Sequence, residues 1–236
     1  MLLGNYKDLL NGFKEKKYEF ISFDDFKPSF SNQLILRHDI DFDCGLALEM
    51  ARIEFKENVK STYFFLLSNN LYNPFSSENL KLIDEIKNLG HDISLHFDAS
   101  IYKNVLEGLQ KEIKLFNYFF NVKIKIISLH RPSTIGFLSK EILNGIKDIS
   151  PNIYTTYSDS FFKKTKYFAD STGEFTEGHP LESIEFKQTK NIQLLIHPIW
   201  WIGEGNNKYE RIEWFKKLKE IKSHSDLKKS LKFYGK

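Results

Sequence analysis

The sequence predicts an α/β fold, a single-domain distorted (β/α) barrel of about seven parallel strands over residues 1–236. Short apolar runs alternate with segments of helical apolar spacing along the whole chain, which is typical of parallel strands joined by right-handed crossovers. The 236 residues fall short of the ~250 of a full eightfold barrel. A doubly wound open sheet is the alternative, but no glycine-rich phosphate loop supports it.

Local spacing predicts the individual elements in order. An amphipathic helix over residues 5–17 precedes a short extended piece at 19–23. Further strands are expected at 34–41, 61–67, 91–96, 125–129, 152–156 and 192–196. Further helices are expected at 44–55 with Asp43 as N-cap, at 77–89, 102–120, 138–147, 208–222 and 225–233. The polar segment 158–190 is expected to form loops and short strands.

Composition excludes several classes of protein. Hydrophobic residues make up 41% and charged residues 28%, a balance typical of soluble globular proteins. The net charge of +3 is too small to indicate nucleic-acid binding. No stretch approaches the ~20 apolar residues of a membrane span, and no signal-peptide run is present, so a cytoplasmic location is expected. The single cysteine, Cys44, permits no intrachain disulfide and is expected to pack in the core.

The strand predicted at 34–41 ends in alternating acids. Asp39 and Asp41 are two residues apart, so they share one face of the strand. Two carboxylates on one face repel each other unless a cation or a shared proton separates them. The alternative is an ordinary junction of strand and loop capped by aspartate. The spacing therefore indicates a candidate metal site.

Imidazoles stand at the ends of three further strands. They are His96, His130 and His197. The carboxyl ends of parallel barrel strands converge on one mouth, so these side chains are expected to meet the acids there. One Asp with two His suits zinc, cobalt, nickel or iron. Asp39 is then left to accept a proton and His197 to donate one, which is a hydrolytic arrangement.

Four motifs of the chain resemble the polysaccharide deacetylases of carbohydrate esterase family 4. They are RHDID (37–41), GHDISLH (90–96), LHRPS (129–133) and LLIHPIWW (194–201). The resemblance implies a distorted (β/α) barrel in which Asp39 is the general base, Asp41 a metal ligand and His197 the general acid. It makes His96 the first histidine of the second motif and Arg131 the arginine that orients the base.

The chain departs from the family pattern at one position. The family has a second ligand histidine four residues after the first, where this chain has Ser100. We expect His130 to replace it, with Asp98 as the alternative; a weak site of two ligands is the third possibility. His91 begins its predicted strand, so it is expected to lie away from the mouth and to bond the backbone.

Three further residues are candidates for substrate contact. Asp170 is placed at the mouth or, equally, in a surface turn. Trp200 and Trp201 follow His197 closely and offer indole faces for sugar stacking, although such pairs also pack under loops.

The expected function is that of a metal-dependent hydrolase, with zinc as the first choice of metal. It removes an N-acyl group, most simply N-acetyl, from an amino sugar in surface-polysaccharide biosynthesis. A carbohydrate or small molecule is therefore the expected partner, and the oligomeric state is left open. The rivals are a hydrolase of cyclic amides and a degenerate barrel that only binds sugar.

Overall fold

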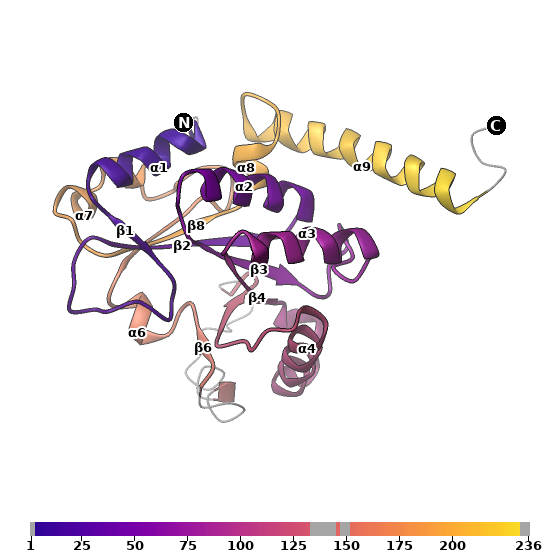
Figure 1. Ribbon diagram of the computed structural model, residues 1–236, viewed down its shortest axis with the longest axis horizontal. Helices are drawn as coiled ribbons and strands as arrows, with labels where there is room; N and C mark the ends of the chain where they lie inside the picture. Colours follow the sequence, from indigo (N-terminus) through magenta and orange to yellow (C-terminus); the bar gives the residue numbers. More distant parts are fainter. Residues whose placement is uncertain (1–2, 133–144, 147–151, 232–236) are drawn as a thin grey trace.

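The computed structural model describes residues 3–132, 145–146 and 152–231, and within them eight strands form one parallel sheet (Figure 1). Seven strands follow the order β6-β5-β4-β3-β2-β8-β7, and β1 pairs with β2. The strands are β1 Glu19–Ile21, β2 Gln33–Ile40, β3 Thr62–Leu66, β4 Asp92–Phe97, β5 Ile126–Leu129, β6 Tyr154–Thr155, β7 Lys166–Ala169 and β8 Ile192–Ile196. The sheet curls, as the predicted distorted barrel requires.

Strand β2 pairs with three other strands of the sheet. Its residues 34–38 pair with β8 along one edge. Along the other edge its first half pairs with β1 and its second half with β3. All eight of its residues are buried, which explains why the strand is a continuous apolar run until its polar end.

Helices cover the outer face of the sheet (Figure 1). Helix α2 packs on β2, and α3 and α4 pack on β4. The long helix α9 starts beside α8 and extends away from the sheet. The helices are α1 Tyr6–Glu15, α2 Cys44–Lys56, α3 Ser77–Asn88, η1 Ala99–Ile101, α4 Val105–Phe120, α6 Asp159–Phe162, η2 Pro180–Glu182, α7 Ile184–Lys187, α8 Ile199–Ile202 and α9 Lys208–Ser230.

Local chemistry sets the ends of these helices. The carboxylate of Asp43 accepts the backbone N–H of Gly45 at 2.8 Å, so Asp43 is the N-cap of α2 as predicted. Gly90 follows α3 with φ of 93°, a left-handed conformation that glycine adopts without steric cost. Asn121 ends α4 in the left-handed region with φ of 49°.

The inside of the curled sheet changes from apolar to polar along the strands. Near the strand starts, Ile35, Phe64 and Ile126 pack into one cluster. Beyond it, Arg37 bridges the two ends of the sheet path. Its Nη2 donates to the hydroxyl of Tyr157 after β6 at 3.2 Å and to that of Tyr167 in β7 at 3.3 Å. A buried cation therefore links β6 and β7 through the interior.

The structure confirms the fold class and each predicted strand. The segment 158–190 contains β7 and three short helical turns. Two separate helices at 208–222 and 225–233 were a wrong prediction, because α9 runs unbroken to Ser230. Most of the helix predicted at 138–147 lies outside the described residues. Cys44 is buried as expected. In the described part of the chain, no helix has the length and apolar character that crossing a membrane requires.

Candidate metal and catalytic site

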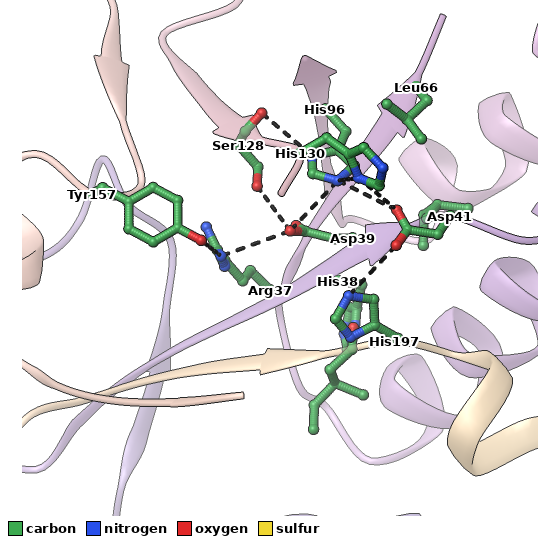
Figure 2. A network of polar contacts seen from close by, with 12 residues as sticks. Arg37, His38, Asp39, Asp41, Leu66, His96, Ser128, His130, Tyr157 and His197 are labelled. Atoms are coloured by element: carbon green, nitrogen blue, oxygen red, sulfur yellow. Dashed lines mark hydrogen bonds and ion pairs between the residues drawn. The ribbon is translucent and has the colours of Figure 1, made fainter. Parts of the chain in front are cut away.

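Three ligand-type side chains meet where the strands end. Asp41 follows β2, His96 lies in β4, and His130 follows β5 (Figure 2). Oδ1 of Asp41 lies 3.3 Å from Nε2 of His96 and 3.6 Å from Nδ1 of His130. The two imidazole nitrogens are 3.1 Å apart. The structure thus brings together the three residues predicted as metal ligands.

The spacing of these three atoms fits a metal ion. Metal–ligand bonds of about 2.0–2.1 Å place two ligand atoms of a tetrahedral site about 3.3 Å apart. The observed separations of 3.1, 3.3 and 3.6 Å scatter around that value. Oδ1 of Asp41 is buried and accepts no hydrogen bond from the described residues. Nδ1 of His96 lies 3.3 Å from the carbonyl of Ser128, which leaves Nε2 directed at the cluster.

Electrostatics also prepare the cluster for a cation. Burial opposes ionisation of Asp41, but His96 outweighs it and lowers the pKa of Asp41 to about 2. Burial lowers the pKa of His96, yet Asp39 and Asp41 outweigh burial and raise it. For His130, burial and the nearby His96 lower the pKa. A metal held here would need the neutral imidazole of His96, so its affinity would depend on pH.

Asp39 lies beside the cluster with one oxygen engaged and one available. Its Oδ2 accepts a hydrogen bond from Ser128 Oγ at 2.9 Å and lies 3.8 Å from Nε2 of His96 (Figure 2). Its Oδ1 is buried and has no hydrogen-bond partner among the described residues. Burial opposes ionisation of Asp39, but Arg37 and His96 outweigh it and hold the pKa below the ordinary value. Asp39 is thus an ionised carboxylate with a free oxygen.

A guanidinium that lies beside Asp39 belongs to Arg37, a residue that the motif resemblance did not select; the orienting role expected of Arg131 stays a prediction. Nη2 of Arg37 lies 3.7 Å from Oδ2 of Asp39, and the Arg37 side chain is fully buried. Arg131 is exposed and has φ of 46°. The sequence carried a signal for this arrangement. Arg37, Asp39 and Asp41 are each two residues apart, so all three share one face of the strand.

His197, at the end of β8, faces the cluster from the opposite side. Its Nε2 lies 3.8 Å from Oδ2 of Asp41 (Figure 2). Its Nδ1 lies 2.6 Å from Oδ1 of Asp170, and its backbone N–H donates to the same carboxylate at 3.0 Å. Burial lowers the pKa of His197, but Asp170 outweighs it and raises the pKa to about 9. His197 is therefore protonated at neutral pH.

The three residues predicted to contact substrate make the following contacts within the protein. Asp170 is fully buried, and Trp201 donates to its Oδ2 from Nε1 at 2.6 Å, so Asp170 supports His197 rather than facing a substrate. Trp200 is buried in a cluster with Leu46 and Phe215. The ring of Trp201 packs against Tyr6 at a centroid distance of 5.5 Å. Trp200 is therefore packed, as the alternative expectation had it, whereas Trp201 is half-buried and its contact with a sugar stays a prediction.

The alternative ligands lie outside the cluster. Oδ1 of Asp98 accepts the backbone N–H of Ser100 at 2.9 Å and its hydroxyl at 2.6 Å, so Asp98 caps η1. His91 lies at the other end of β4, where its Nε2 bonds the carbonyl of Ala51 at 3.1 Å. The expected placement of His91 away from the mouth is confirmed.

No family model matches this sequence, and no curated protein matches it. Solved structures do match it.

A pseudoenzyme of family CE4 from Bacillus anthracis has 16% identity and a TM-score of 0.47, and the match covers 91% of this chain and 77% of that chain. The polysaccharide deacetylase Bc1974 from Bacillus cereus has 16% identity and a TM-score of 0.46, covering 80% and 87%. The chitin deacetylase from Colletotrichum lindemuthianum has 14% identity and a TM-score of 0.49, covering 80% and 83%. The first of these proteins belongs to the carbohydrate esterase family that the four motifs resemble.

Proposed function

We propose that this protein is a metal-dependent hydrolase that removes an N-acyl group, most simply N-acetyl, from an amino sugar. One observation carries the proposal. Asp41, His96 and His130 form a ligand triangle, with the available Oδ1 of Asp39 on one side and protonated His197 on the other. An amide hydrolase needs these three functions, namely polarisation of the carbonyl, a base and an acid.

The donor set of one carboxylate and two imidazoles suits zinc, cobalt, nickel or iron. A divalent metal bound there would acidify water and polarise the amide carbonyl. Its remaining positions stay open to water and substrate, because only three ligands come from the described residues. Zinc is the first choice, since this set resembles the three-ligand catalytic zinc sites of hydrolases.

Asp39 accepts the proton of the attacking water at Oδ1. Its other oxygen is held by Ser128, and the charge of Arg37 lies next to it. These contacts keep the carboxylate ionised and fix its orientation while Oδ1 stays available. A base of depressed pKa is a weak proton acceptor, so the step depends on water being acidified at the same site.

His197 donates the proton that the departing amine needs. Asp170 binds the Nδ1 side of the ring, and this places Nε2 on the side of the cluster. The same hydrogen bond favours the imidazolium form before the step. Base and acid thus approach the scissile amide from two strands, β2 and β8.

The amino-sugar substrate rests on the motif resemblance. Hydrolysis of a cyclic amide uses the same chemistry and is the second candidate for the substrate. The expected setting, surface-polysaccharide biosynthesis in the cytoplasm, stays a prediction.

A substrate panel tests the proposal. Purified protein loaded with zinc or cobalt is incubated with N-acetylated monosaccharides, oligosaccharides, nucleotide-linked amino sugars and cyclic amides, and release of acetate or a new carboxylate is measured. We expect turnover of an N-acetylated sugar and a loss of about 10²–10⁴-fold in Asp39→Asn, with bound metal unchanged. Asp98→Asn is the matched control at the same edge. Fully metal-loaded protein that hydrolyses nothing on the panel contradicts the proposal.

A further inference from the structure

A buried carboxylate outside the site forms a second polar cluster. Glu54 of α2 is fully buried, and its Oε1 accepts the hydroxyl of Tyr6 and lies 2.7 Å from Nε2 of His38. Its Oε2 accepts Ser61 Oγ at 2.6 Å and Tyr63 OH at 2.7 Å. The cluster joins α1, α2, β2 and β3 behind the strand that carries the catalytic acids.

His38 connects this cluster to the strand end that carries His197. His38 lies in β2 next to Asp39, and its side chain points to the opposite face of the sheet. Its Nδ1 lies 3.3 Å from the carbonyl oxygen of Ile196 in β8. Glu54 and this carbonyl are both hydrogen-bond acceptors, so each nitrogen of the His38 ring faces one acceptor. Ile196 directly precedes His197.

Tyr6 provides a second, indirect connection between Glu54 and the His197–Asp170 pair. Its hydroxyl donates to Glu54, and its ring packs edge-on against Trp201 at a centroid distance of 5.5 Å. Trp201 donates to Asp170, the partner of His197, at 2.6 Å. Glu54 therefore supports, through two different side chains, both the backbone before His197 and the indole that holds Asp170.

We propose that Glu54 is a positioning residue for the His197–Asp170 pair and acts through His38 and Tyr6. The inference rests on the proposed function, in which His197 is the acid. A buried ionised group is costly, and apolar packing would stabilise the same space at least as well. Two of the four hydrogen bonds of Glu54 lead on toward His197: the one to His38, whose Nδ1 lies 3.3 Å from the carbonyl of Ile196, and the one to Tyr6, whose ring packs against Trp201.

The test compares two sides of the same carboxylate. Glu54→Gln and His38→Gln change the side of the carboxylate that reaches Ile196. Ser61→Ala acts on the other side, where it removes the hydroxyl that donates to Oε2 of Glu54 and lies 3.1 Å from Nδ1 of His91. In protein labelled with ¹⁵N-histidine, the proton on Nδ1 of His197 is observed directly, without substrate. Unfolding in urea, kcat and KM are measured in parallel.

We expect the resonance of this proton to move in Glu54→Gln and His38→Gln and to stay at its wild-type position in Ser61→Ala. We also expect kcat to fall about tenfold or more in the first two variants, with KM within about twofold, because misplacement of the acid slows the chemical step. If Glu54→Gln does not fold, His38→Gln carries the same comparison.

Two results overturn the positioning role. In the first, the His197 resonance does not move in His38→Gln, while the unfolding free energy falls as much as it does in Ser61→Ala. The cluster would then only stabilise the fold. The other is a resonance that moves equally in Ser61→Ala, which indicates general loosening. The resonance can move as expected in the two variants while the wild-type protein hydrolyses no amide. That result supports the positioning role and counts only against the proposed function.

Discussion

Oδ1 of Asp170 lies 2.6 Å from Nδ1 of His197, and the backbone N–H of His197 donates to the same carboxylate. The carboxylate therefore fixes both the proton on Nδ1 and the orientation of the ring. Nε2 is left facing Asp41 across the site at 3.8 Å. In the proposed function, this relationship makes His197 the proton donor rather than a fourth metal ligand.

Asp170→Asn tests that relationship. The amide keeps the shape of the side chain but removes the charge that holds His197 protonated. We expect kcat to fall by about 10²–10⁴-fold, as for loss of a general acid, with bound metal unchanged. Steady-state kinetics and elemental analysis measure the two quantities. Trp201→Phe removes the hydrogen bond that the uncharged indole N–H donates to Asp170 and leaves the carboxylate in place, so it is expected to lower kcat by about tenfold at most. Equal losses in both variants would mean that packing, not charge, is what Asp170 supplies.

Arg37→Met tests the assignment of Arg37 as the partner of Asp39. The positive charge lowers the pKa of Asp39, so its removal raises that pKa. Asp39 works as a base only when ionised, and activity falls as pH drops through its pKa. The acid limb of the pH profile of kcat/KM is therefore expected to move to higher pH.

Arg37→Lys keeps the charge and is expected to leave that limb near its wild-type position. Arg131→Met is the comparison for the arginine that the motif resemblance selected. If the acid limb of the kcat/KM profile moves in Arg131→Met and stays in place in Arg37→Met, then Arg131, and not Arg37, is the partner of Asp39.

Ionisation of Glu54 makes the free energy of unfolding depend on pH. Burial raises its pKa, but His38 outweighs burial and lowers it from 4.5 to about 2. A carboxyl group with a lowered pKa in the folded state stabilises the fold above its unfolded pKa and loses that contribution as pH falls toward the folded value. The stability difference between wild type and Glu54→Gln is therefore expected to narrow by about 1 kcal/mol between pH 7 and pH 3.5.

Urea unfolding at the two pH values measures this difference. Comparing the two proteins at each pH cancels the titration of the other carboxylates. Ser61→Ala, which keeps the carboxylate, should retain most of the wild-type pH dependence. A difference that stays constant or widens with acid would show that Glu54 does not carry its charge in the folded protein.

Much of the fold was predictable because the strands are short apolar runs with clear boundaries. The predicted elements were less accurate in segments without such signals. β7 has only four residues in a polar region, and pairing with β8 creates it. Helix α9 has few apolar positions after Leu218, so its continuation to Ser230 follows from helix propensity rather than from a buried face.

The ligand triangle was predictable because parallel strand ends converge, and this rule needs no detail of packing. The environment of each catalytic group was harder to predict. Arg37 could have been assigned from its two-residue spacing to Asp39, whereas the motif resemblance favoured Arg131. The contact of Asp170 with His197 joins β7 and β8, and no local pattern of sequence predicts such a pair.

The most direct test measures bound metal per chain. Protein purified without a metal-affinity tag, and then reconstituted with zinc, is analysed for wild type, Asp41→Ala, His96→Ala and His130→Ala. Asp98→Ala and His91→Ala are the matched controls, because both residues lie outside the ligand triangle. We expect close to one metal ion in wild type and in the controls, and little in the three ligand variants. Metal kept in His130→Ala and lost in Asp98→Ala, or no metal in any sample after reconstitution, would contradict the account.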